Sequence, residues 1–104
     1  METRFFQHLA DEVQIAPESI VSRTLQSDNG AKIILFAFDT GQELSEHTAS
    51  VPAMIQILRG EADIKLGEDT YSVGEGAFAS MPASLPHSIM AKTPVVMLLI
   101  MLSK

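Results

Sequence analysis

Two histidines are the side chains in this sequence best suited to acid–base or metal chemistry. His47 lies six residues after Gly41, and His87 lies five residues after Pro82, so each follows a turn-forming residue. Imidazole titrates near neutral pH and is a common ligand of first-row transition metals. Either ring could therefore hydrogen-bond a ligand, transfer a proton or bind a metal.

The rest of the composition excludes several kinds of chemistry. The sequence has no cysteine, which excludes disulfides, thiolate metal sites and cysteine nucleophiles. Ser45, Ser80 and Ser84 lack the context of a nucleophile elbow, and the glycines at 74–76 precede no Lys-Ser/Thr pair of a phosphate loop. Seven basic residues against thirteen acidic ones give a net charge of −6, and the bases form no cluster. Nucleic acid and anionic membrane are therefore not expected partners.

Short strands separated by regular turns are expected from residue 19 onward. Glycine, proline, asparagine and aspartate recur every several residues, and the segments between them are rich in β-branched and aromatic side chains. This pattern is typical of a sandwich or barrel. The strands are predicted near 19–26, 31–39, 44–48, 53–59, 61–66, 70–73, 77–81, 87–91 and 95–102.

The strands differ in how many of their faces are apolar. Glu61–Leu66 alternates charged and apolar residues, which predicts one buried and one wet face. Ile33–Phe38 and Val95–Leu102 are apolar on both faces, so each must be covered on both sides. The outer cover is predicted to be either the N-terminal segment or a second subunit.

A single domain is expected, with an N-terminal segment at 1–18 and a barrel at 19–104. Phe5, Phe6, Leu9 and Val13 recur at roughly helical spacing before Pro17, which is compatible with a short N-terminal helix. The first residues lack the pattern of a signal peptide. The longest apolar run of the whole sequence, Val95–Leu102, is too short to span a bilayer. Together with the lack of cysteine, these features predict a cytoplasmic protein.

The glycine, proline and histidine spacing resembles the two-part signature of the cupins, small β-barrels that often hold a metal. The resemblance rests on Gly41-x5-His47 running on to Gly60, and on Gly76-x5-Pro82-x4-His87. It implies an all-β double-stranded β-helix, or jelly-roll barrel, that pairs sheet against sheet as a homodimer. Two of the four ligand positions of the family are Ala49 and Ala53 here, where a histidine and a glutamate are usual. Two milder departures are Ser84 in place of glycine and Ala91 in place of asparagine.

The resemblance implies that His47 and His87 face the barrel interior and act as metal ligands. Two histidines are fewer than the roughly three protein ligands of most catalytic metal sites. Strand alternation turns Glu46 away from His47, whereas Glu43 shares its parity and reaches inward only if the preceding loop folds over the mouth. We therefore expect a divalent transition metal (Fe, Mn, Ni or Zn) to be weakly held or absent.

The alanines also leave space inside the barrel. Either Met54, Met81, Met90 or Phe36 refills that space, or it remains as an apolar pocket with two imidazoles at one end. Arg23, between Ser22 and Thr24, is a further candidate to point inward and hold an acidic ligand. The predicted pocket residues are His47, Ala49, Ala53, His87, Met81 and Phe36.

Three functions are compatible with this sequence, and it does not decide whether the protein is catalytic. The first is a protein that binds a small metabolite in the barrel, with the histidines as hydrogen-bond partners. The second is a metal-dependent enzyme of the dioxygenase, isomerase or decarboxylase type. The third is a structural or regulatory dimer without a ligand.

Overall fold

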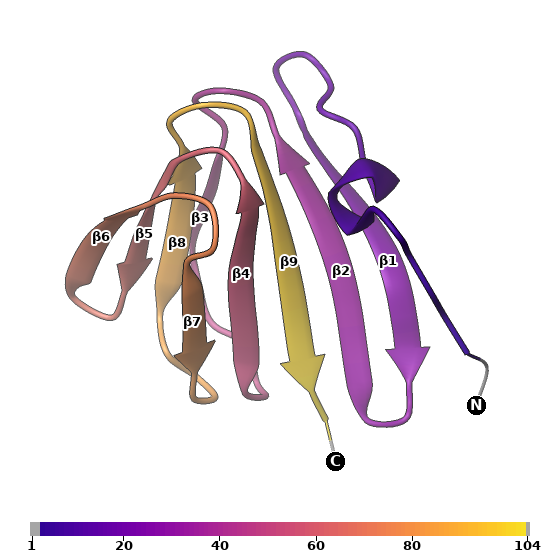
Figure 1. Ribbon diagram of the computed structural model, residues 1–104. Helices are drawn as coiled ribbons and strands as arrows, with labels where there is room; N and C mark the ends of the chain where they lie inside the picture. Colours follow the sequence, from indigo (N-terminus) through magenta and orange to yellow (C-terminus); the bar gives the residue numbers. More distant parts are fainter. Residues whose placement is uncertain (1–2, 104) are drawn as a thin grey trace.

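A computed structural model describes residues 3–103 (Figure 1). It contains one short 3₁₀ helix, η1 (Leu9–Glu12), and otherwise strands joined by turns. The strands are β1 (Ile20–Asp28), β2 (Ala31–Phe38), β3 (Glu43–His47), β4 (Ala53–Arg59), β5 (Ala62–Leu66), β6 (Asp69–Val73), β7 (Phe78–Met81), β8 (His87–Ala91) and β9 (Val95–Leu102). The predicted all-β class is confirmed, and the predicted strand ranges agree with these to within two residues.

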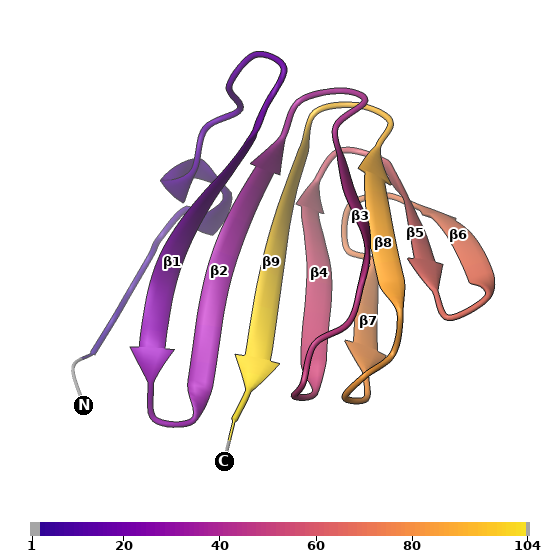
Figure 2. The same ribbon diagram turned by 180° about the vertical axis from the view of Figure 1, so that it is seen from behind.

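Two antiparallel sheets face each other. One has five strands in the order β1-β2-β9-β4-β7, and the other has four in the order β3-β8-β5-β6. Seen from behind, the four-stranded sheet covers the half of the larger sheet that contains β4 and β7, while β1 and β2 extend beyond it (Figure 2). Among the described strands, β1–β2 and β5–β6 pair as sequence neighbours, and every other pairing joins segments that are distant in the sequence, as in a jelly roll.

The core lies between the sheets and follows the alternation of the strands. In β4, the side chains of Ala53, Ile55 and Ile57 are buried, whereas Gln56 between them is exposed on the opposite face. In β5, Ala62 and Ile64 are buried, as the alternation within Glu61–Leu66 predicts. The other buried members of this cluster are Phe38, Met81, Ile89, Ala91, Val95 and Met97.

The N-terminal segment covers part of the outer face of the five-stranded sheet. Val13 is buried with Leu35, Ala37 and Val96 in a second apolar cluster, and Leu9 packs against that cluster. In Figure 1 the segment lies over β1 and β2, and through Val13 it also covers Val96 near the start of β9. The expected N-terminal helix is reduced to the single turn η1, which carries no buried residue.

Ion pairs attach this segment to the sheet. Arg23 of β1 contacts the Glu12 carboxylate at 2.6 Å, and Arg59 of β4 contacts the Asp11 carboxylate at 2.7 Å. The suggestion that Arg23 points into the barrel is therefore wrong, because its strand parity places it on the outer face beside η1. Within residues 3–103, no helix combines the length and apolarity that crossing a bilayer requires.

Candidate functional site

The two candidate histidines are direct cross-strand neighbours. His47 at the end of β3 pairs with His87 at the start of β8, and their ring centroids are 4.2 Å apart with the planes tilted by 58°. The register of this strand pair shifts between Leu44 and His47, which marks a β-bulge or similar irregularity. With an unbroken register Glu46 would lie opposite His87, so the shift places an imidazole there in place of a carboxylate.

Each imidazole is held by a backbone carbonyl two residues earlier in the chain, within β3 for His47 and in the turn before β8 for His87. Nδ1 of His47 lies 2.8 Å from the carbonyl oxygen of Ser45, and Nδ1 of His87 lies 2.8 Å from that of Leu85. A carbonyl oxygen can only accept, so Nδ1 is the donor in both rings. The proton of each neutral ring therefore sits on Nδ1, and Nε2 keeps its lone pair for another partner.

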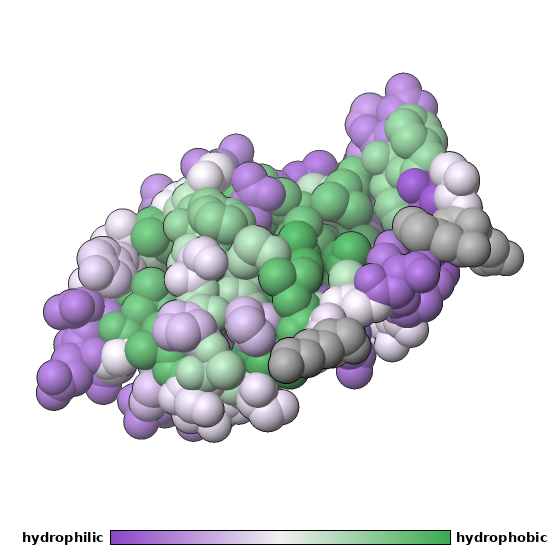
Figure 3. Space-filling view, turned by 90° about the horizontal axis from the view of Figure 1, so that it is seen from below, coloured by the Kyte–Doolittle hydropathy of each residue, from purple (hydrophilic) through white to green (hydrophobic). Residues whose placement is uncertain are grey.

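The two rings differ in their access to solvent. His87 is 7% exposed and shares the inner face of β8 with the buried residues Ile89 and Ala91. His47 is exposed, at the edge of the four-stranded sheet. One imidazole thus belongs to the interior and the other to the rim. Figure 3 looks onto this end of the barrel, where apolar surface occupies the middle and hydrophilic side chains lie along the margin.

The two alanines at the remaining family positions lie close to this end. Ala53 is 3% exposed and pairs directly with Met81 of β7, inside the same apolar cluster as Phe36. Ala49 lies in the loop after β3, where its carbonyl oxygen accepts a hydrogen bond of 2.7 Å from the Ser84 N–H. This bond ties the loop after His47 to the turn that precedes His87.

Of the three methionines considered to fill the barrel, one lies on the inner face and two lie on the outer faces. Met81 is 3% exposed on the inner face, whereas Met54 and Met90 pair across their sheets with residues of the outer faces, Ser80 and Glu43. Met81 therefore contributes to the interior, and Met54 and Met90 do not.

The acidic residues near the histidines point outward. Glu46 forms an ion pair of 3.6 Å with Lys65 on the outer face of β5, as its predicted parity requires. Glu43 pairs with Met90 on that same outer face, so the suggestion that it shares the side of His47 is wrong. The irregularity after Leu44 is the reason, because it reverses the parity between these two positions.

The donor set falls short of a resident metal site. Among residues 3–103, no three His, Cys, Asp or Glu side chains gather closely enough to hold a metal ion. The histidine pair offers two free Nε2 atoms, fewer than the three or four protein ligands typical of zinc and related sites. The residues present therefore do not fit a tightly held metal.

Two other polar residues lie outside the histidine pair. The backbone N–H groups of Glu18 and Thr40 donate to the Asp39 carboxylate at 2.8 and 2.9 Å, and these bonds hold the pKa of Asp39 below its ordinary value. His8 is exposed in the N-terminal segment, and its side chain makes no capping hydrogen bond to η1.

The features that orient the imidazoles could not be recognised in the sequence. The accepting carbonyls of Ser45 and Leu85 each lie two residues before a histidine, a spacing that no side-chain type reveals. A weak signal exists for the second turn, since Ser84 occupies a glycine position of the family pattern and has a φ of 70°.

Comparisons with known proteins agree with this architecture. The sequence matches the family described as Cupin domain over residues 34–101. A conserved protein of unknown function from Streptococcus pyogenes is 36% identical over the whole of this chain and 91% of its own, with a TM-score of 0.88. A cupin superfamily protein from Desulfitobacterium hafniense is 25% identical over 100% of this chain and 95% of its own, with a TM-score of 0.89.

A third similar structure is a Cupin 2 conserved barrel domain protein from Leptotrichia buccalis. It is 29% identical over 90% of this chain and 46% of its own, with a TM-score of 0.83. The search among curated proteins found no match.

Proposed function

This chain belongs to the cupin family, and we propose that it binds a small molecule inside its barrel, at the end where His47 and His87 meet. The observation that carries the proposal is the shared orientation of the two rings. Both Nδ1 atoms are engaged by backbone carbonyls, which leaves two Nε2 acceptors on rings 4.2 Å apart.

The surroundings of His87 favour a ligand with both polar and apolar parts. Its inner-face neighbours are apolar, and Ala53 and Met81 belong to the same interior cluster. Small-molecule sites commonly combine an apolar lining with a few convergent polar groups. A neutral imidazole pair accepts hydrogen bonds, so the ligand class that fits is a small metabolite that presents a hydroxyl or an acidic O–H to the rings.

The direct test is a thermal-shift screen with hydroxylated and carboxylic metabolites. It compares the wild-type protein with His47→Ala, His87→Ala and the matched control His8→Ala, which removes an exposed imidazole elsewhere. A ligand of this site raises the melting temperature of the wild type and of His8→Ala, and raises that of the other two variants much less. Equal stabilisation of all four proteins would place the ligand elsewhere.

A metal-dependent reaction is the second candidate, favoured by one observation. Histidines that bind metals usually donate their other ring N–H to a carbonyl or carboxylate, which is the arrangement of both rings here. With two protein ligands we expect such a metal to be weakly held. Elemental analysis of untagged protein, purified without chelator, tests this: stoichiometric metal that His87→Ala loses would favour the enzyme over the binding protein.

We also propose that two copies of the chain pair through the outer face of the five-stranded sheet. Leu98 and Ile100 of β9 and Met54 of β4 lie on this face and are only half-buried. The run Val95–Leu102 contains no charged residue. Solvent-exposed apolar area of this kind commonly marks a protein interface.

A further inference from the structure

A pocket opens on the side of the barrel, and neither histidine of the pair lines it. Strand β7 is an edge of the five-stranded sheet and β6 is an edge of the four-stranded sheet, and both views place them on the same side of the molecule (Figures 1 and 2). Between them lies a pocket of about 320 Å³, which we call the lateral cleft. It is lined by Ile55, Ile64, Leu66, Tyr71, Ser72, Val73, Ala77, Phe78, Ala79 and Ser80.

The wall of the lateral cleft is apolar from the core to the surface. Ile55 and Ile64, 3% and 4% exposed, form its inner end. Tyr71 and Phe78 lie at its margin and are 49% and 60% exposed, and they are two of the five large hydrophobic side chains that the described residues expose. Aromatic rings at the entrance of an apolar pocket provide large contact surfaces for a ring-containing ligand.

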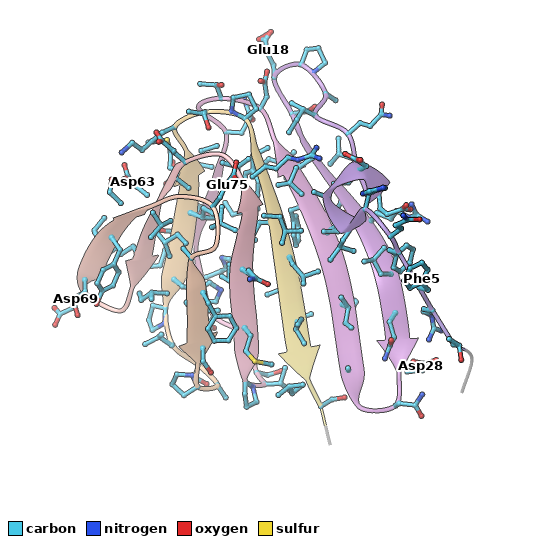
Figure 4. All side chains as sticks on the ribbon, in the orientation of Figure 1. Phe5, Glu18, Asp28, Asp63, Asp69 and Glu75 are labelled. Atoms are coloured by element: carbon cyan, nitrogen blue, oxygen red, sulfur yellow. The ribbon has the colours of Figure 1, made fainter. Side chains whose placement is uncertain are left out.

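The charges around the lateral cleft argue against an ionic ligand. None of the ten lining residues is charged, so a buried ionic group would lose its hydration without gaining a partner. The labelled acids lie close by: Asp69 begins β6, and Glu75 lies in the turn between β6 and β7 (Figure 4). These carboxylates, with the overall charge of −6, oppose an anion in particular.

Polar atoms of a neutral ligand would still find partners. Among the described strands, β6 pairs only with β5 and β7 pairs only with β4, so each presents one free backbone edge. The hydroxyl groups of Tyr71 and Ser80 add donors and acceptors at the cleft. A few hydrogen bonds around an apolar cavity are sufficient to orient a small molecule.

We propose that the lateral cleft is a binding site for an uncharged, largely apolar small molecule that contains a ring system. The site is distinct from the histidine pair, which lies on β3 and β8, and neither His47 nor His87 lines it. Leu66 is the link between the two places, because it lines the cleft and pairs with His87 across the sheet. Binding in the cleft does not depend on the function proposed for the histidines.

The test measures binding of the uncharged fluorophore N-phenyl-1-naphthylamine to the whole chain. We expect a saturable fluorescence increase with one probe bound per chain. Ala79→Phe fills the cleft from the inner face of β7, opposite Ile55, and should weaken binding about tenfold or more, which corresponds to roughly 1.4 kcal/mol. Ala83→Phe is the matched control, because it makes the same change at an exposed position outside the lining and should leave affinity within about twofold.

Further variants and a second probe test whether the loss of binding comes from the lateral cleft itself, rather than from misfolding or from the histidine pair. The double variant Tyr71→Ala/Phe78→Ala removes exposed side chains and should also weaken binding, whereas His47→Ala/His87→Ala should not. The anionic analogue 1-anilinonaphthalene-8-sulfonate carries the same rings and should bind at least about tenfold more weakly. Absence of saturable binding, or affinity unchanged by Ala79→Phe and by Tyr71→Ala/Phe78→Ala, would overturn the proposal. Binding lost with the histidines would assign the probe to the other site.

Discussion

His47 and His87 present the same edge of the imidazole ring to their own backbones, although they lie forty positions apart in the numbering. In each case Nδ1 lies 2.8 Å from the carbonyl oxygen of the residue two positions earlier. The local irregularity in β3 brings the rings into register, and the two backbone bonds fix their rotation. The pair therefore offers two Nε2 atoms with their lone pairs free.

This arrangement predicts the tautomer of both rings. In the neutral form, the proton should sit on Nδ1 of His47 and of His87, because the accepting carbonyls offer no proton. Long-range ¹H–¹⁵N correlation spectra at alkaline pH measure this directly. His8 serves as the internal reference, and we expect it to show the Nε2-protonated form that dominates in free histidine. Protonation on Nε2 in either paired ring would contradict the observed bonds.

Replacing Gly60 should destabilise the protein strongly, because the surrounding backbone leaves no space for a side chain. It has a φ of 87°, and a Cβ placed there would lie 2.0 Å from the carbonyl oxygen of Pro94. Gly60→Ala combines left-handed backbone strain with a backbone clash, and should lower the free energy of unfolding by roughly 3 to 5 kcal/mol. Gly41→Ala is the matched control.

Gly41 has a similar φ of 82° but nothing within 4 Å of the added Cβ. Gly41→Ala should lower the free energy of unfolding by only about 1 to 2 kcal/mol, because the left-handed backbone conformation is then the sole source of strain. Urea denaturation of both variants measures the difference. Equal losses would mean that the clash at Gly60 relaxes without penalty.

Replacing Ser84 by glycine should stabilise the protein. Its φ of 70° lies in the left-handed region, where a residue with a Cβ is strained. Ser84→Gly removes that strain, partly offset by the greater freedom of glycine in the unfolded chain, so a gain of about 0.5 to 1 kcal/mol is expected. Ser84→Ala keeps the Cβ and should give no such gain in the same denaturation experiment.

Residue pattern predicted most of the fold, because turns and strand faces are local properties. The alternation within Glu61–Leu66 specified which side chains are buried, and the glycines and prolines located the turns. The irregularity after Leu44 could not be predicted, since a shift in register depends on pairing with β8 rather than on the residues of β3 alone. The lateral cleft could not be predicted either. It exists because β6 and β7 become edges of different sheets, and strand order is a property of the whole chain.

The ionised carboxylate of Asp39 should stabilise the folded protein, and this contribution should be lost in acid. Its pKa is lowered in the folded protein by hydrogen bonds from the backbone N–H groups of Glu18 and Thr40. A carboxyl group with a lowered folded pKa stabilises the protein fully above its unfolded pKa, near 3.9, and loses that contribution as the pH falls through the folded value. Asp39→Asn should therefore be less stable than the wild type at pH 7, and the gap should close as the pH falls through the folded pKa of Asp39. Denaturation curves over a series of decreasing pH values measure it, and a gap independent of pH would contradict the assignment.

The outer face of the five-stranded sheet predicts how two copies associate. Ile100 lies on this face, half-buried, beyond the part that Val13 and η1 cover. The wild type should elute as a dimer of twice 11.3 kDa in size-exclusion chromatography with light scattering. Ile100→Lys places a charge where apolar surfaces would meet, so it should shift the protein to monomer at concentrations of about 10 to 100 µM, whereas Thr24→Lys, on an exposed position of β1, should not. A monomeric wild type at the highest concentration, or a dimer that survives Ile100→Lys, would mean that copies do not meet at this face.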